Sequence, residues 1–208
     1  NTVSRGSASV LGLNNTVTSQ YNQTVIGQGN TGSGENAVTI GNACTAGSRA
    51  SIAIGESANA TGSGNDGRIA IGKSASATNN KSIAIGVNGT TCAAEGIAFG
   101  DGVDISSGND RAIGIGNAIS ISTNATDSIV MGTAAGASNQ SAIAIGRNAS
   151  ATADKSVAIG RDVVAAKAST VSVTELETQL AGGGITMVSP NGTEFKLTVS
   201  DAGALVIA

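Results

Sequence analysis

The hydrophobic positions follow a short pattern that recurs along most of the chain. Its clearest copy is Ser-Ile-Ala-Ile-Gly at residues 82–86, and related copies occupy residues 51–55, 68–72, 96–100, 141–146 and 156–160. Weaker copies end at Gly12, Gly27, Gly41, Gly116 and Gly132. The closing glycines are 14 to 17 residues apart, by subtraction of their positions. An apolar motif that recurs at this interval predicts a solenoid in which each copy supplies one turn, here called a rung.

Each repeat predicts two short strands. Side chains alternate between the two faces of a strand, so Ile83 and Ile85 share one face and Ala84 takes the other. Residues 74–77 alternate serine with alanine, which predicts a second strand with one face in water. We expect the isoleucines to fill the interior opposite the alanines of the second strand. Ala84 and its equivalents would then lie against another copy of the chain in a closed oligomer.

The polar and glycine positions predict the two corners of each rung. A closing glycine permits a positive φ or a close approach of two backbones, and Asn, Ser, Asp and Thr gather at the other corner, as turns require. Residues 1–30 hold degenerate repeats in which Asn15 and Asn30 take positions that later hold alanine. Terminal repeats of a solenoid are commonly atypical because they cap the array.

Three enlarged repeats predict protruding loops. One carries an insertion at residues 62–67, and two successive ones carry longer turns at residues 106–111 and 122–127. In the last two, bulkier residues take the alanine positions: Val103, Ile105, Ile119 and Ile121. The roll is therefore expected to be thicker there. Loops on a rigid scaffold often carry binding residues, although surface insertions are also tolerated without any function. The receptor-binding candidates are Asn65, Asp66, Asp104, Asn109, Asp110, Arg111, Asn124 and Asp127.

The repeated Ser-Ile-Ala-Ile-Gly, followed by small-residue stretches such as residues 56–62, resembles the head repeat of the trimeric autotransporter adhesins, the YadA-like heads. The resemblance covers residues 8–166. It implies a left-handed parallel β-roll with two strands per turn, in a homotrimer whose inner sheets meet at the axis. The neck, coiled-coil stalk and membrane anchor that usually follow such heads are not recognised here, and residues 174–180 hold one weak neck-like fragment.

The repeat ends after residues 182–184, and a different fold is expected beyond them. Two apolar stretches flank Asn191-Gly192, a typical hairpin turn, and a second turn at residues 200–203 precedes a third stretch. These features predict an antiparallel β-meander. Residues 189–203 also resemble the C-terminal ending of many bacteriophage tail-fibre and virion proteins. The expected organisation is a trimeric β-roll at residues 1–168, a neck or linker at 169–184 and a meander cap at 185–208.

Composition argues against several classes of function. The 208 residues carry a net charge of −3, which lacks the basic footprint of a nucleic-acid-binding protein. No apolar run reaches the roughly 18 residues of a membrane-spanning helix. Histidine, the commonest general base, is absent, and neither a phosphate-binding loop nor a carboxylate cluster is found. We therefore expect no catalytic site, no metal site and no cofactor.

The two cysteines are not expected to form a disulfide. Cys44 and Cys92 fall on rungs three closing glycines apart, which separates them by about 14 Å at the spacing of parallel strands. That separation is beyond disulfide reach. Because Cys44 takes a position that holds Ala58 or Ala75 in later repeats, we expect it to be a small buried side chain.

The sequence favours two functions, both without covalent chemistry. The first is a bacteriophage tail fibre, part of the virion, that binds a polysaccharide or outer-membrane protein of a bacterial surface. It would join other virion tail proteins through a segment preceding Asn1. The alternative is a trimeric autotransporter adhesin head at the bacterial cell surface, which binds host matrix or cell-surface ligands. An ice-binding solenoid is disfavoured, because Cys92 interrupts the position shared by Thr61, Thr78 and Thr152.

Overall fold

The computed structural model describes residues 1–4, 6–19, 21–62, 67–91, 93–122, 124–174, 185–189, 191–199 and 205–207. The chain divides into two compact units, Asn1–Thr174, here called the roll, and Glu175–Ala208, the C-terminal unit. The described residues form strands and turns, and none of them belongs to a helix that could cross a membrane. The all-β class expected from the sequence is confirmed.

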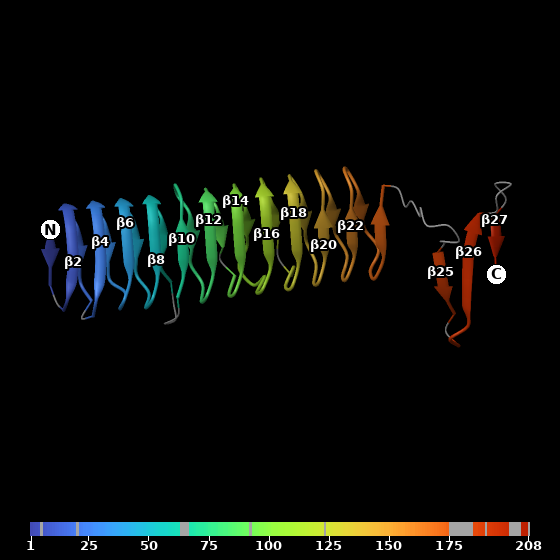
Figure 1. Ribbon diagram of the computed structural model, residues 1–208, viewed down its shortest axis with the longest axis horizontal. Helices are drawn as coiled ribbons and strands as arrows, with labels where there is room; N and C mark the ends of the chain where they lie inside the picture. The colour runs from blue at the N-terminus through green and yellow to red at the C-terminus, as the bar shows by residue number, and fades with distance from the viewer. Residues whose placement is uncertain are drawn as a thin grey trace. The chain divides into compact units, whose positions relative to one another are not determined.

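The roll contains two parallel sheets of twelve strands each in the part of the chain that is described (Figure 1). The long-strand sheet consists of β2 (Ala8–Leu13), β4 (Gln23–Gln28), β6 (Val38–Asn42), β8 (Ile52–Glu56), β10 (Ile69–Ile71), β12 (Ile83–Val87), β14 (Ile97–Asp101), β16 (Ile113–Asn117), β18 (Ile129–Thr133), β20 (Ile143–Ile145), β22 (Val157–Ile159) and β24 (Val171–Val173). The short-strand sheet consists of β1 (Thr2–Val3), β3 (Thr16–Val17), β5 (Thr31–Gly32), β7 (Thr45–Ala46), β9 (Asn59–Ala60), β11 (Ser76–Ala77), β13 (Thr90–Thr91), β15 (Asp104–Ile105), β17 (Ser120–Ile121), β19 (Gly136–Ala137), β21 (Ser150–Ala151) and β23 (Val164–Ala165).

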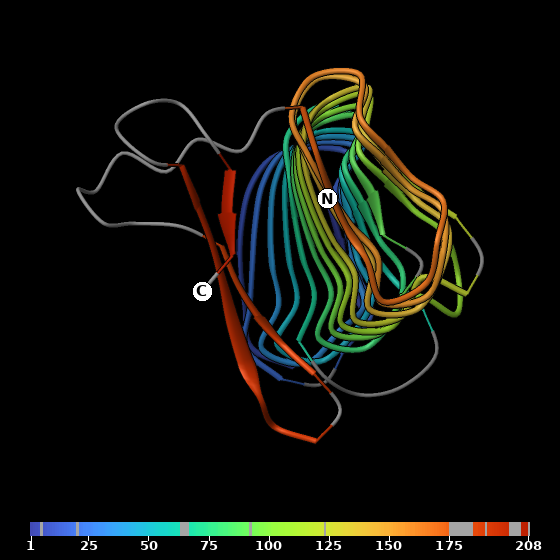
Figure 2. The same ribbon diagram turned by 90° about the vertical axis from the view of Figure 1, so that its right-hand side faces the viewer.

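The register of the long strands is constant from rung to rung. Ile83 pairs with Ile69 on one side and with Ile97 on the other. The insertion at residues 62–67 does not change it, since Ile52 pairs with Ile69. A parallel solenoid with two strands per turn is thus confirmed, and Figure 2 shows its rungs superposed in two facing layers.

The interior of the roll is filled by small side chains, and the orientation predicted for the long strands was wrong. Ala84 is fully buried between the two sheets, whereas Ile83 and Ile85 lie on the outer face and are only partly covered. A rung that closes in about 14 residues, with only two residues in its short strand, leaves an interior too narrow for isoleucine. Over the regular rungs this core consists of Ala37, Cys44, Ala46, Ala53, Ala58, Ala60, Ala70, Ala75, Ala77 and Ala84.

The two enlarged rungs have a different core. Their short-strand side supplies larger side chains that are fully or almost fully buried: Val103, Ile105, Ile119 and Ile121. In β16 the long strand has a smaller residue than usual, because Gly114 takes the position that alanine occupies in the regular rungs. A Cβ at Gly114 would lie 2.8 Å from Val103 Cγ1 and 3.2 Å from Ile119 Cγ2. Large side chains thus face glycine in the first enlarged rung, whereas in the second the long strand supplies Val130, which is also fully buried.

The closing glycines form a continuous column at the end of the long strands. Gly86 has a φ of 131°, in the region that side chains disfavour, and a Cβ there would overlap the carbonyl oxygen of Gly100 on the next rung. The same arrangement recurs between Gly100 and Gly116. Both roles predicted for these glycines, positive φ and close backbone approach, therefore apply.

The first rungs carry a buried ladder of side-chain amides. Asn15 Nδ2 donates to the Gly27 carbonyl at 2.9 Å, and its Oδ1 accepts the Asn30 backbone N–H at 3.0 Å. Asn30 repeats the pattern, because its Oδ1 accepts the Cys44 N–H at 2.9 Å. The Cys44 thiol ends the ladder 3.1 Å from the Gly55 carbonyl oxygen. Cys44 is buried as predicted; Cys92 lies outside the described residues.

The C-terminal unit contains the predicted meander. β25 (Ile185–Val188), β26 (Glu194–Val199) and β27 (Leu205–Ile207) form an antiparallel sheet in that order. At the first turn Gly192 has a φ of 87° and its N–H donates to the Ser189 carbonyl at 2.9 Å. The second turn and most of the neck-like fragment lie outside the described residues. The segment expected to be a linker, residues 169–184, begins within the last rung, since β24 belongs to the roll.

The glycine column can be tested within a single rung. Gly86→Ala should lower the free energy of unfolding by at least about 2 kcal/mol, because it combines a disfavoured φ with a clash against backbone. Gly89→Ala is the matched control, since open space surrounds its Cβ position and its φ lies outside the left-handed region. Thermal and denaturant unfolding of both variants measures the difference. Equal stability would contradict the close approach of successive rungs.

The assignment of inner and outer faces has its own test. Ala84→Leu should destabilise the roll by about 1–3 kcal/mol, because the added carbons have no space between the sheets. Ile85→Leu conserves volume on the outer face and should change the unfolding free energy much less. Comparison of the two by denaturant unfolding decides which face is inside; the opposite order would restore the orientation expected from the sequence.

Candidate functional site

The turns that follow the short strands form one corner of the roll, and two of them are longer than their neighbours. The rungs from Gly100 to Gly116 and from Gly116 to Gly132 are 16 residues long, whereas the next two are 14, by subtraction. These two longer turns end on residues with positive φ, Arg111 and Asp127, both at 60°. The extra residues are 107–108 and 123–124, of which Thr123 lies outside the described residues.

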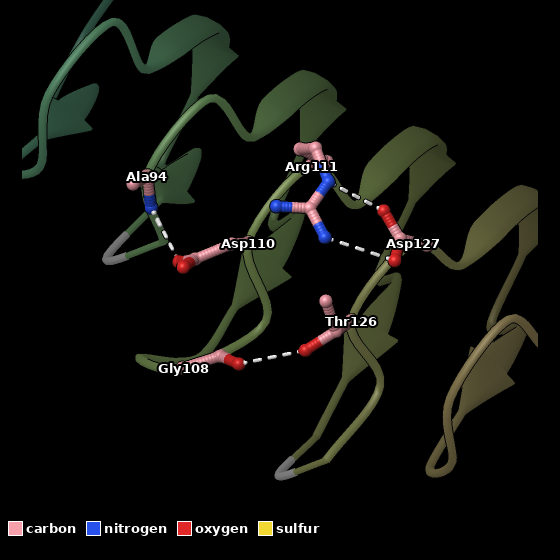
Figure 3. A network of polar contacts seen from close by, with 6 residues as sticks. All are labelled: Ala94, Gly108, Asp110, Arg111, Thr126 and Asp127. Atoms are coloured by element: carbon pink, nitrogen blue, oxygen red, sulfur yellow. Dashed lines mark hydrogen bonds and ion pairs between the residues drawn. The ribbon is translucent and has the colours of Figure 1, made fainter.

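An ion pair links the two enlarged turns. Arg111 Nε lies 2.6 Å from Asp127 Oδ1, and a terminal nitrogen of Arg111 donates to Asp127 Oδ2 at 2.9 Å, as Figure 3 shows. This hydrogen bonding lowers the pKa of Asp127 and raises that of Arg111. Both side chains are exposed, so water and salt screen the pair and it adds little stability. Its bidentate geometry does fix the orientation of one turn against the other.

Two further hydrogen bonds tie the enlarged turns to neighbouring backbone (Figure 3). Asp110 Oδ1 accepts the Ala94 N–H at 3.0 Å, and Thr126 Oγ1 donates to the Gly108 carbonyl at 3.0 Å. One oxygen of the Asp110 carboxylate is therefore already used within the protein. These contacts, together with the ion pair, make the enlarged turns a fixed structure rather than free loops.

Asn109 supports the turns from inside. It is fully buried, and its Nδ2 donates to the Ser106 and Ile121 carbonyls at 3.1 and 3.0 Å. Its Oδ1 accepts the Ala125 N–H at 2.7 Å. A receptor cannot reach this side chain, so the role expected for Asn109 from the sequence is corrected: it holds two turns together.

The other candidates fall into three groups. Asp110, Arg111, Asn124 and Asp127 lie on the two enlarged turns, and all but Asp110 are exposed. Asp104 is also exposed, but it lies on strand β15 of the short-strand sheet. Asn65 and Asp66 lie outside the described residues. Four of the candidates from the sequence therefore lie together at one corner of the roll.

A groove of about 450 Å³ lies beside the enlarged turns, here called the turn groove. It is lined by Gly108, Asn124, Thr126, Asn139, Gln140 and Asp154. The last three belong to the regular turns of the next two rungs, and sequence reasoning missed them. The signal that could have found them is the drop from 16-residue to 14-residue spacing at Gly132, because a step between long and short turns leaves a hollow.

A larger hollow, of about 620 Å³, lies at the first rungs and is bordered by Ser7, Asn22 and Asn36. Its lining includes Gln23, whose Nε2 is held by the Gly34 carbonyl at 2.8 Å. Arg5 and Gln20, near it in sequence, lie outside the described residues. Within the described ranges no cluster of three or more His, Cys, Asp or Glu side chains could hold a metal ion.

Comparison with known protein families matches part of the roll to a family of head-domain repeats. The family model for the YadA head domain repeat matches residues 69–88, 124–149 and 137–162. The first segment contains β10 and β12, and the other two extend over β18 to β22 and contain most of the turn groove. A search of curated proteins found no match. The matched segments and the parallel pairing of the rungs together support a YadA-like head β-roll.

Proposed function

We propose that the roll is the head of a trimeric autotransporter-type adhesin at a bacterial cell surface. It binds ligands of a host matrix or cell surface non-covalently, without catalysis. The observation that carries the proposal is the YadA head match on a roll whose long-strand sheet has an uncovered apolar outer face. The match supports the class of protein, and the apolar face supports its assembly.

The outer apolar face consists of two columns of side chains, one on each side of the buried alanines. In β12 these are Ile83 and Ile85, which pair with Ile97 and Phe99 on the next rung. Phe99 is 53% exposed. In the same column the exposed members are Leu11, Ile26, Phe99, Ile115, Met131, Ile145, Ile159 and Val173. Soluble monomers rarely expose so continuous an apolar surface.

We expect the apolar outer face of one chain to be covered by the same face of two further chains. The columns have the same rung spacing in every chain, so identical rolls aligned side by side match rung for rung, as a closed symmetric oligomer requires. The surfaces that meet in this homotrimer are the isoleucine columns rather than the alanines, because the alanines are already buried within each chain.

The C-terminal unit favours assembly independently. Its strands leave Ile185, Met187, Val188 and Phe195 between 41% and 62% exposed. A three-stranded sheet is near the lower limit of independent stability and needs a buried apolar face. Since the described part of this unit does not bury those side chains by itself, we expect it too to associate with copies of itself.

The tail-fibre function, which the sequence favoured first, has less support. It was based on residues 189–203 and on the absence of a recognised stalk and anchor, and the family match falls entirely on the roll. The family match gives no support to a location in the virion or to contacts with other virion proteins. The adhesin head, which the sequence offered as its alternative, is therefore the function that the described structure and the family match favour.

The trimer can be tested with one charge on the outer face of each sheet, on the consecutive strands β16 and β17. Ile115→Asp should shift the protein from trimer towards monomer, because three carboxylates would be buried together at the interface. Ser120→Asp, on the exposed outer face of the opposite sheet, is the control and should leave the trimer intact. Sedimentation with circular dichroism separates dissociation from unfolding. A folded, fully associated Ile115→Asp variant would rule out this face.

The adhesin function is tested by binding of the labelled full chain to immobilised animal matrix proteins and animal cells, beside a panel of bacterial strains. We expect saturable binding to at least one animal surface. Binding restricted to particular bacterial strains would overturn the proposal and support the tail fibre instead.

A further inference from the structure

We propose that the turn groove binds an uncharged, hydroxyl-rich ligand, namely a neutral glycan. The proposal is based on the adhesin function above and places its ligand site on one corner of the roll. It follows from the shape of the groove, the chemistry of its lining and the rigidity of the turns around it.

The shape comes from a step in turn length. Gly108 and Asn124 are extra residues of the enlarged turns that the regular turns lack. They therefore project further from the roll than the regular turns at the same corner. Asn139, Gln140 and Asp154 belong to the shorter turns that follow and complete the lining. Two enlarged rungs followed by two regular ones produce one such step, and about 450 Å³ is room for a small number of sugar rings.

The lining can both donate and accept hydrogen bonds. Asn124 and Gln140 each offer two N–H donors and a carbonyl acceptor, and the Asp154 carboxylate offers strong acceptors. Among the described residues, no hydrogen-bond or ion-pair partner is found for these three side chains. Asn139 and Thr126 are partly used, since Asn139 Nδ2 donates to Thr152 O at 2.5 Å and Thr126 Oγ1 donates to Gly108 O. Adjacent sugar hydroxyls, each a donor and an acceptor, match such a mixed set.

The charge of the groove selects against anionic ligands. Among the described residues that line the groove, Asp154 is the charged side chain and none is a lysine or arginine. Arg111, on the neighbouring enlarged turn, is bound by Asp127 in a bidentate ion pair, and Lys155, which follows Asp154, is exposed but is not part of the lining. Sulfated, phosphorylated or sialylated glycans would therefore meet a carboxylate in a lining that has no lysine or arginine among its described residues to balance them. A neutral glycan pays no such electrostatic penalty.

The turns around the groove are preorganised. The Arg111–Asp127 pair and the Thr126–Gly108 bond join the two enlarged turns, and buried Asn109 joins them from inside. A ligand that binds here does not have to order a loop first, which lowers the cost of binding. Because the site has no aromatic side chain, each groove would bind weakly. Three grooves on a trimer would raise the apparent affinity for a surface that presents many copies of the glycan.

The experiment uses the full chain on a printed array of neutral, sialylated and sulfated oligosaccharides, followed by titration of the best neutral oligosaccharide in solution. Two variants alter the groove, Gln140→Ala and Asp154→Asn. Glu35→Ala is the matched control, because Glu35 is exposed, takes the same turn position on a regular rung and lies outside the groove. We expect binding to neutral glycans, at least about tenfold weaker in both groove variants, and unchanged in the control with the same thermal stability.

Several outcomes would overturn the proposal: no neutral glycan bound, preference for anionic glycans, or full binding by both groove variants. If the chain binds animal matrix or cells under those results, the adhesin function stands and the groove proposal alone fails. If groove-dependent binding to neutral glycans is found on bacterial strains instead, the groove proposal stands and the adhesin function fails.

Discussion

The rest of the roll depends on the tight closure of each rung. A rung must turn twice within about 14 residues and still stack on the next at the spacing of a parallel sheet, about 4.8 Å. The glycine column meets this requirement at one corner, because at Gly86 and its equivalents the next carbonyl occupies the place of a side chain. At the other corner single residues such as Lys81 and Glu95 adopt positive φ, a strained conformation that the surrounding hydrogen bonds maintain.

The same constraint decides which side chains face inwards and so creates the surface for association. Because the closed rung is narrow, alanine, cysteine and asparagine fit between the sheets, and isoleucine does not unless the rung is enlarged. The isoleucines of the long strands are left outside in continuous columns. The stability of one chain and the assembly of several chains are thus linked. The isoleucine face does not fit inside the narrow rung, and it is therefore the face that a partner chain would cover.

The sequence predicted the period, the two strands per turn, the solenoid and the meander, because glycine spacing and Asn191-Gly192 are local signals. It did not predict which face of the long strand is internal. Alternation places Ile83 and Ala84 on opposite sides, but both are apolar, and only the distance between sheets decides between them. For the site, the long turns were visible in the sequence, whereas the buried role of Asn109 depends on its contacts with the next rung. The groove wall at Gln140 also went unpredicted, since it arises from a difference between neighbouring turns.

Enlarged turns change the surface without changing the scaffold. Ile97 pairs with Ile113, and Ile113 with Ile129, although the turns between them are longer. The extra interior space around Gly114 is filled by Val103, Ile119 and Ile121, so the two sheets keep their packing. At the glycine corner no such freedom exists, because any side chain would meet backbone. Variation in turn length is therefore confined to one corner of the roll, and a ligand site that must differ between related heads while the rungs stay in register is best placed there.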